Sequence, residues 1–461
     1  MDKKTAEKIL IEAKERLKQA DTAESRNRST WVEDTNFALK GAQWPEKIVS
    51  EREREGRPCL TINRLPAIIA QVIGDQRQNQ MSVKVRPVDD KGDVQVADIM
   101  SGLIRNIGYQ SNGRAIRDHA FEQAATGGFG YYCITTQYAG VETFDQEIRL
   151  KRILNPLSVF VDPEVKEPDY SDANWYLIAE WMSKKDFEKS YPKAEVVDID
   201  VSTDAGLWSA AERVRVAAYW RKVKTKKTIV QLNDGSVVDK GKATPEFLAA
   251  SFTQESNGMI TQIPARTIVK EREVEVVKVE QYKLSGNAVL EGPMEWPSQY
   301  IPIIPVLGKE SYVEGERLLH GMIHWAKDSQ RMYNYWRTTA TELIALTPKA
   351  PYLLTPEQVE GHEGMWQTSN AKNNPYLLYN TIAGAALPQR AMPAPVPQGV
   401  FTEAQVSVDD IKATTGLFDA SLGATSNETS GRAILARQKE GDVSTYVFVD
   451  NLARAIAYEG H

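Results

Sequence analysis

Apolar residues recur at helical spacing near the N-terminus of the chain. Ile9, Ala13, Leu17 and Ala20 lie three or four positions apart, so they share one face of a helix over residues 1–30. Such a helix either packs on its own domain or serves as an arm that docks on a partner. Packing on its own domain is the favoured interpretation.

The following segments predict more helices and a strand. The alternating charges of residues 51–55 indicate a solvated helix end, which Gly56 closes. Residues 61–73 open a second, apolar helix. Residues 81–87 alternate apolar and charged side chains and predict a strand, and residues 95–125 predict one helix.

A glycine cluster at residues 127–130 ends that helix. Glycines can cradle a phosphate where a strand turns into a helix. Here a helix precedes the glycines and a strand over residues 131–138 follows them, which is the wrong order for a phosphate loop. The cluster therefore predicts a tight turn.

Strands dominate the next part of the chain. Residues 149–162 and 211–233 are strand-rich, and residues 265–307 hold three more strands. Residues 233–235 read Asn-Asp-Gly between two apolar runs, which predicts a hairpin. The first 310 residues therefore predict an α+β body, in which helices pack on mostly antiparallel strands.

The pattern changes after residue 310. Asp328 is placed to cap a helix that runs to about Leu346, where prolines end it. Prolines recur through residues 349–397, which indicates a small, separately folded excursion.

Two helices and a loop complete the chain. A helix over residues 399–415 is followed by a loop at residues 417–429 that is rich in Ser, Thr, Gly and Asn. Ser430 can then cap a last long helix.

Composition narrows the class of protein. The 461 residues are 42% hydrophobic and 26% charged, which is typical of globular proteins. The net charge of −6 argues against a basic coat that grips nucleic acid, although it permits nucleic acid to slide past. Cys59 and Cys133 are the only cysteines, so we expect a reducing compartment and a cytosolic product that does not engage a membrane.

Motifs for catalysis are weak. The sequence has no Walker A loop, because neither Gly241-Lys242 nor Gly308-Lys309 is followed by Ser or Thr. His320 and His324 lie four residues apart, but two ligands are too few for zinc. We therefore expect no metal and no cofactor.

One acidic segment keeps an enzymatic alternative open. Residues 162–172 contain five carboxylates, among them Asp162, and such residues can hold the metals of a nuclease. Metal sites usually gather carboxylates from different elements, and this stretch is contiguous and broken by prolines. A solvated loop is therefore the favoured interpretation, and no catalysis is expected.

Several stretches together resemble the portal proteins of short-tailed double-stranded-DNA phages. None is specific by itself, but their order from about residue 30 to the end is. They are GRP at 56–58, TINRLP at 61–66, GDQRQN at 74–79, VFVDP at 159–163, AKDSQRMYNY at 326–335, PKAPY at 348–352, SGRAI at 430–434 and DNL at 450–452.

The resemblance implies a portal fold and an arrangement of domains. Residues 1–310 would be the wing, and residues 311–348 and 398–416 would contain the two stem helices. Residues 349–397 would be the clip, residues 417–429 the tunnel loop, and residues 430–461 a helix directed back to the wing.

The resemblance also implies a function and partners. About twelve subunits would form a ring at one capsid vertex, and double-stranded DNA would pass through its channel without sequence specificity. The terminase large subunit and a tail adaptor would dock on the clip, and the scaffold and capsid proteins would surround the ring. The protein would assemble in the host cytoplasm and end in the virion.

Candidate residues follow from this assignment. A helix that lines a DNA channel should not hold phosphates, because each cation that neutralises a phosphate adds affinity. Residues 399–415 carry one lysine against three acids. The candidates that face DNA are Lys412, Leu417, Phe418, Asp419, Ser421 and Asn427. Those for docking on the clip are Tyr352, Trp366, Tyr376 and Tyr379, and those for the contact between subunits are Met332, Trp336 and Leu343.

One departure from the family pattern leaves alternatives open. Members usually continue into a crown and often a helical barrel, and this chain stops at His461, so we expect those parts to be missing. The alternatives are a metal-dependent nuclease that uses residues 162–172 and a capsid or connector protein that forms no ring.

Overall fold

A computed structural model gives the fold of the chain. It describes residues 2–87, 93–195, 213–233, 235–249, 252–256, 259–263, 265–346, 352–369, 375–391, 397–417 and 445–461. Helices and antiparallel sheets are mixed, which confirms the α+β class. Among these residues, none of the helices combines the length and the apolarity needed to cross a bilayer.

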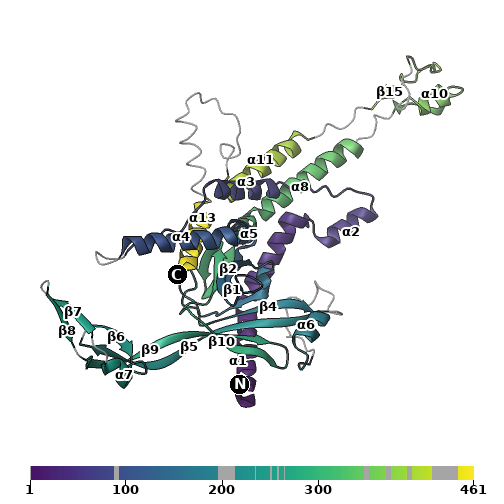
Figure 1. The fold of residues 1–461 in the computed structure, drawn as a ribbon. Helices are drawn as coiled ribbons and strands as arrows, with labels where there is room; N and C mark the ends of the chain where they lie inside the picture. The colour runs from purple at the N-terminus through teal and green to yellow at the C-terminus, as the bar shows by residue number, and fades with distance from the viewer. Residues whose placement is uncertain are drawn as a thin grey trace.

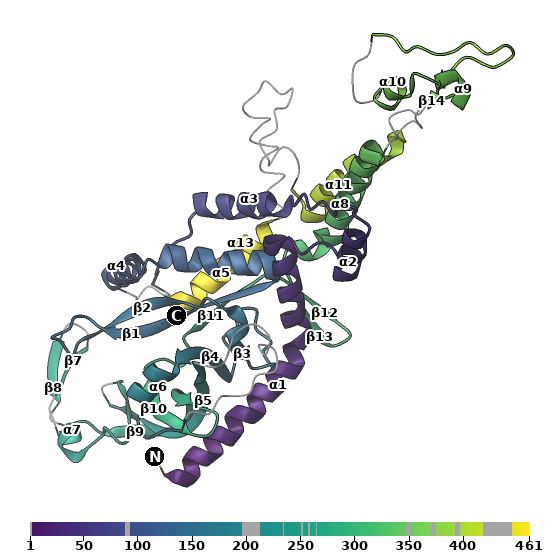
Figure 2. The ribbon, with the colours of Figure 1, turned by 90° about the vertical axis from the view of Figure 1, so that its right-hand side faces the viewer.

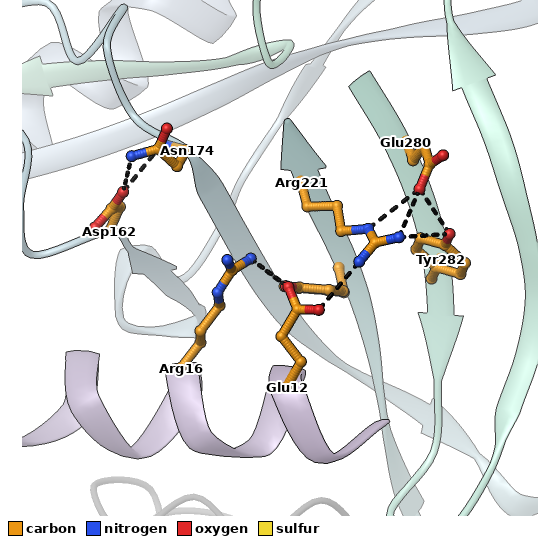
Figure 3. Close-up of polar contacts among 8 residues, drawn as sticks. Glu12, Arg16, Asp162, Asn174, Arg221, Glu280 and Tyr282 are labelled. Carbon is orange, nitrogen blue, oxygen red and sulfur yellow. Dashed lines mark hydrogen bonds and ion pairs between the residues drawn. The ribbon is translucent and has the colours of Figure 1, made fainter. Parts of the chain in front are cut away.

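Helix α1 (Lys3–Thr35) packs along the largest sheet. The four predicted stripe residues are buried against sheet residues that include Leu177 and Tyr219, which confirms that the helix packs on its own domain. Polar contacts fix its position, since Arg221 of the sheet donates to Glu12 at 3.0 Å and to Glu280 at 3.1 Å (Figure 3). A short π-helical turn (Asn36–Lys40) and α2 (Glu46–Arg54) follow.

The largest sheet has six antiparallel strands in the order β10-β9-β5-β4-β3, with β6 paired to β5. The strands are β3 (Val159–Val161), β4 (Trp175–Ser183), β5 (Arg213–Leu232), β6 (Val237–Asp239), β9 (Ile268–Leu284) and β10 (Val289–Trp296). A 3-10 turn (Pro156–Ser158) precedes β3, and α6 (Lys184–Ser190) follows β4. The pairing of β5 with β6 confirms the hairpin, although Asp234 lies outside the described residues.

Strands β5 and β9 are much longer than their neighbours and leave the sheet as a two-stranded ribbon (Figure 1). The far end of the ribbon carries α7 (Pro245–Ala249), β7 (Phe252–Ser256) and β8 (Met259–Ile263). The sequence predicted strands here but not their length.

A second core lies around the three-stranded sheet β11-β1-β2. Its strands are β1 (Phe129–Tyr138), β2 (Gln146–Arg152) and β11 (Ile303–Leu307), and its helices are α3 (Leu65–Gln78), α5 (Gly113–Gly127) and α13 (Tyr446–Gly460). Phe121, Tyr132, Ile304 and Leu452 are almost fully buried together. The hairpin of β12 (Lys309–Val313) and β13 (Glu316–His320) projects on the side of α1 (Figure 2).

Two predictions for residues 61–127 are wrong in detail. Residues 81–87 do not form a strand, because the backbone there is held by a helix: the Val85 N–H donates to Ser101 Oγ at 3.0 Å. The predicted helix over residues 95–125 is two helices, α4 (Val94–Gln110) and α5, because Asn112 adopts a φ of 51°. The glycine turn is confirmed, since Gly128 ends α5 with a φ of 108°.

Helices α8 (Ile323–Leu346) and α11 (Gln398–Thr415) lie side by side and project from the body (Figures 1 and 2). The predicted C-terminal ends of α8 and α11 agree with the structure, and α11 begins one residue before its predicted start. Helix α8, however, begins five residues before Asp328. Asp328 is exposed and pairs with Arg331 at 3.0 Å, so it does not cap the helix. Beyond the pair lie β14 (Tyr352–Leu353), α9 (Pro356–Val359), α10 (Glu363–Gln367) and β15 (Gln389–Arg390).

Candidate functional site

Helix α11 has one buried face and one acidic face. Val400, Ala404, Val408 and Ile411 recur at spacings of three or four and are buried. The exposed face carries three carboxylates, on Glu403, Asp409 and Asp410. An anionic surface of this kind repels the phosphates of nucleic acid.

Lys412 is the only cation on α11, and its charge is paired. Its side chain is only 18% exposed, and Nζ lies 3.6 Å from the carboxylate of Asp409 one turn earlier. The residue predicted to face DNA is therefore present on the helix, but its charge is balanced by a neighbour.

The remaining residues predicted to face DNA divide into two groups. Leu417 is only 2% exposed and lies in the second core with Ile411 and Leu452, so it closes the helix end and we leave it out of the DNA-facing set. Phe418, Asp419, Ser421 and Asn427 lie outside the described residues, and their role stays a prediction.

A ladder of polar side chains holds α8 to the body. Residues of α8 four positions apart accept hydrogen bonds from alternate backbone N–H groups of residues 60–64. The pairs are Thr338 Oγ1 with Leu60 N at 3.2 Å, Asn334 Oδ1 with Ile62 N at 3.0 Å, and Gln330 Oε1 with Arg64 N at 3.2 Å. Four residues of helix rise about 6 Å and two residues of extended chain rise about 6.6 Å, so the spacings match.

An ion cluster continues this polar ladder toward the projecting end of α8. Glu342, four residues after Thr338, accepts from Arg52 and from Arg57, and the Arg57 contact measures 3.1 Å. Gln330, Asn334, Thr338 and Glu342 are all buried. The sequence analysis missed them, although four polar residues at four-residue spacing are the signal of a buried polar face.

The residues predicted for a contact between subunits lie on other faces of α8. Met332 and Leu343 are exposed, and Trp336 is half-buried with its ring edge-to-face against that of Tyr335, the ring centroids being 5.3 Å apart. Apolar side chains left open in one copy are available for contact with another. That role stays a prediction.

The four predicted docking aromatics lie together beyond the projecting ends of helices α8 and α11. Tyr352 and Trp366 pack edge-to-face with ring centroids 5.0 Å apart, and Trp366 Nε1 donates to the Leu378 carbonyl at 2.7 Å. Tyr376 is 64% exposed, and Tyr379 is also exposed. The first two residues therefore form a local core, and the two tyrosines present their rings to solvent.

An open groove lies beside these aromatics. It has a volume of about 460 Å³, and its lining includes Tyr352, Leu354, Ala386 and Leu387. Gln358 also lines it, and its side-chain amide donates to the Ala386 carbonyl at 2.8 Å. A shallow, mostly apolar groove of this size suits a peptide segment.

The two histidines noted in the sequence stack against each other at the base of α8. The rings of His320 and His324 are 4.0 Å apart, and His324 Nδ1 lies 3.4 Å from the carboxylate of buried Asp34. Burial lowers the pKa of both histidines, and the proximity of His324 to His320 and of Lys327 to His324 lowers it further. Burial also raises the pKa of Asp34.

The acidic segment is a set of turns. Asp162 is buried and accepts from the Asn174 side chain at 2.9 Å (Figure 3). It also accepts from the Glu164 N–H at 3.1 Å. Asp172 accepts from the Lys166 N–H at 2.8 Å. These carboxylates are used to shape the backbone, and within the described ranges no three His, Cys, Asp or Glu side chains are grouped to hold a metal ion.

Known proteins resemble this chain over nearly its whole length. A model of the phage P22-like portal protein family matches residues 14–461. The portal protein of Acyrthosiphon pisum secondary endosymbiont phage 1 is 26% identical over 464 aligned positions, which cover 96% of this chain. The chain spans 63% of the length of that relative.

Proposed function

The chain belongs to the phage P22-like portal protein family, and we propose on that premise that its copies form a ring at one capsid vertex through which double-stranded DNA enters and leaves. Proteins of this family are structural components of phage particles, and we assign no catalysis to this chain. About twelve subunits and a position in the virion are part of the proposal.

The acidic face of α11 is the observation that carries this proposal. A channel must surround the duplex without binding it, and phosphate contacts summed around a ring would act as a brake. Glu403, Asp409 and Asp410 are exposed on α11, and Lys412 is paired with Asp409. A helix of this charge suits the wall of a channel in which DNA slides.

The projecting elements divide into parts with separate roles. Helices α8 and α11 act as the stem, with the predicted tunnel loop at residues 417–429 directly after α11. The body up to residue 310 acts as the wing, and the unit at residues 349–397 acts as the clip. The polar ladder on α8 supports this division, because it fixes the stem to the body through hydrogen bonds that leave the acidic face of α11 free.

The clip is the proposed docking site for the terminase large subunit during packaging and for a tail adaptor afterwards. Tyr376 and Tyr379 supply exposed aromatic surface, and the groove at Tyr352 and Leu387 is large enough for a peptide. The scaffold and capsid proteins are the proposed partners of the wing.

Particle size and an axial view test the ring. Mass photometry of the purified chain should give particles of about twelve subunits, and electron cryomicroscopy should show a central hole wider than B-form DNA. Residues 398–415 should face this hole. Particles without a hole, or an α11 turned outward, would overturn the proposal.

The two alternatives give different results in the same preparation. A nuclease would cut DNA when magnesium is added and would lose this activity in Asp162→Asn. The hydrogen bonds that use Asp162 within its loop disfavour this alternative. A connector protein that forms no ring would stay a monomer or dimer without cleaving DNA.

A further inference from the structure

An open pocket lies beside helix α5 in the body of the chain, and we call it the α5 pocket. It has a volume of about 490 Å³, and its lining includes Arg77, Arg114 and Arg152. Arg77 lies in the last turn of α3, Arg114 in the first turn of α5 and Arg152 at the end of β2. Helix α5 lies between the other two elements (Figure 2). The fold therefore brings arginines from three separate elements to one pocket.

No carboxylate balances the charge of Arg114 or of Arg152. Arg114 Nη2 donates to the carbonyl of Arg77 at 3.1 Å. Arg114 Nη1 donates to the side-chain oxygen of Gln80 at 2.7 Å, with that amide oriented to suit its neighbours. Both of these acceptors are neutral. Arg152 is exposed, and within the described part of the chain it forms no ion pair.

The lining of the α5 pocket also includes two acids. Asp118 is buried, and its carboxylate lies 3.3 Å from Arg77 Nε, so these two charges balance each other. Glu122 has no ion pair among the residues that the structure describes. Burial, and then the charge of Arg152, lowers the pKa of His119, so its ring is neutral at pH 7.5. Three arginines against two acids leave the pocket with one positive charge.

We propose that the α5 pocket binds a phosphate group. A guanidinium group presents a planar set of N–H donors that matches the oxygens of a phosphate or a carboxylate. A phosphate group has four oxygens around one centre, so it can be approached from three elements at once, whereas a carboxylate has only two. The volume of the pocket is in the range of small-molecule sites, which leaves room for the molecule that carries the phosphate.

The phosphate group has two sources, which are a free phosphate ion or small ester and the backbone of nucleic acid. The lining of the α5 pocket includes no residue of α8 or α11. A ligand bound there is therefore additional to the DNA of the proposed channel, and the inference does not depend on the proposed ring.

Thermal unfolding of the full chain in increasing inorganic phosphate tests the pocket, at pH 7.5 and constant ionic strength. A ligand that binds only the folded chain raises the unfolding temperature according to its concentration and affinity. Phosphate also stabilises proteins by its exclusion from their surface, and this effect is common to the wild type and its variants. The quantity to compare is therefore the phosphate concentration that gives half of the saturable response.

Single substitutions in the lining should change this concentration in opposite directions. Arg152→Gln removes an uncompensated cation, so the concentration should rise at least about tenfold. Glu122→Gln removes a negative charge from the lining, so the concentration should fall by a factor of about two to five. Lys151→Gln is the matched control, because it removes the same charge from the neighbouring residue, whose Nζ pairs with Glu180 at 3.2 Å. The control should bind phosphate as the wild type does.

Two results would overturn the inference. One is a wild-type chain without a saturable response to phosphate. The other is an equal loss of affinity in Arg152→Gln and Lys151→Gln, because binding would then follow net charge alone. Because Arg152 and Lys151 are both exposed, neither substitution should change the unfolding temperature without phosphate.

A second arm distinguishes the two sources of the phosphate group. The affinity of each variant for a short DNA duplex is measured by fluorescence anisotropy. A larger loss in Arg152→Gln than in Lys151→Gln would support a pocket that accepts backbone phosphates. Equal affinity for DNA, together with the difference in inorganic phosphate, would support a pocket that accepts free phosphate or a small ester.

Discussion

Arg117 of helix α5 donates from Nε to the carboxylate of Glu459 in the last helix at 2.8 Å, although 342 positions separate the two residues in the chain. Both side chains are largely buried, and the hydroxyl of Tyr132 donates to the same carboxylate at 2.7 Å. Burial, and then the charge of Glu459, raises the pKa of Tyr132 well above its ordinary value, so the phenol stays protonated as a donor. This cluster holds α13 to the body.

Replacement of Glu459 by glutamine should destabilise the protein. The substitution leaves the Arg117 guanidinium buried without its counter-charge, which we expect to cost about 3 kcal/mol of unfolding free energy. Chemical denaturation of the purified chain measures this cost. The control is Asp450→Asn on the same helix, which breaks the exposed Arg454–Asp450 pair and should cost less than about 1 kcal/mol. Equal effects would show that Glu459 contributes no more than a surface charge.

The polar ladder predicts how firmly α8 is held to the body. Asn334→Ala removes the buried side chain that accepts from the Ile62 N–H, so we expect a loss of about 1–3 kcal/mol in the unfolding free energy. Thr341→Ala is a matched control, because the Thr341 hydroxyl is exposed and bonds only within its own helix. Urea unfolding followed by circular dichroism compares the two variants. An Asn334→Ala protein as stable as the control would mean that the polar ladder does not hold α8 to the body.

Charge on α11 should control how DNA interacts with the assembled ring. Asp409→Lys/Asp410→Lys adds cations to the proposed channel wall and releases Lys412 from its partner, so linear duplex DNA should bind more tightly. The plot of log K against log salt should steepen by about 0.9 for each phosphate newly contacted.

Fluorescence anisotropy at several salt concentrations measures this change. Glu273→Lys/Glu275→Lys, on the exposed ribbon strand β9, makes the same change in net charge away from the proposed channel. We expect a clearly smaller gain in affinity for this control. A gain as large as that of the α11 variant would place the DNA elsewhere.

The stacked histidines should make stability depend on pH. The pKa of both histidines is lower in the folded chain than in the unfolded chain, so unfolding takes up protons. Their contribution to folding stability is therefore complete above the unfolded-state pKa of about 6.5. It is lost as the pH falls below that value. The raised pKa of Asp34 has the opposite effect on stability, because the folded chain binds a proton there at a higher pH than the unfolded chain does. Lys327 Nζ lies 2.7 Å from the Asp34 carboxylate.

Thermal unfolding between pH 7.5 and pH 5.5 measures the balance of these groups. The wild-type chain should lose stability toward the acid end, and His320→Gln/His324→Gln should lose less. His362→Gln removes a histidine at the start of α10, away from the stacked pair, and should follow the wild-type curve. A double variant with the same pH dependence as wild type would exclude the stacked pair as the cause.

Local patterns in the sequence were enough to predict the elements whose signals are local. The stripe from Ile9 to Ala20 gave α1 and its packed face, and the prolines after Leu346 gave the end of α8. The Asn-Asp-Gly turn at residues 233–235 gave the β5–β6 hairpin. In each case the residues that decide the structure lie within a few positions of one another.

Features that depend on distant partners could not be predicted in this way. Residues 81–87 alternate like a strand, but among the residues that the structure describes no strand pairs with them, and the Val85 N–H donates to Ser101 of α4 instead. The buried polar side chains of α8 accept hydrogen bonds from residues 60–64, and the sequence of α8 alone does not show that this segment lies against the helix. The exposure of Ile99 and Leu103 on α4 likewise follows from how this helix packs on its neighbours through Ala97 and Ser101, which its own periodicity does not specify.

The polar ladder on α8 accepts hydrogen bonds from the main chain of residues 60–64, and this decides which substitutions in that segment preserve the hydrogen bonds. Gln330, Asn334 and Thr338 accept from N–H groups, so these hydrogen bonds do not themselves depend on the side chains of Leu60, Ile62 and Arg64. Proline is the exception, because it has no N–H to donate. The side chains have constraints of a different kind, since Ile62 packs on the second core and Arg64 lies over the Tyr333 ring at 4.8 Å. The anchor of α8 therefore requires a main chain with free N–H groups at alternate positions and three accepting side chains that face it.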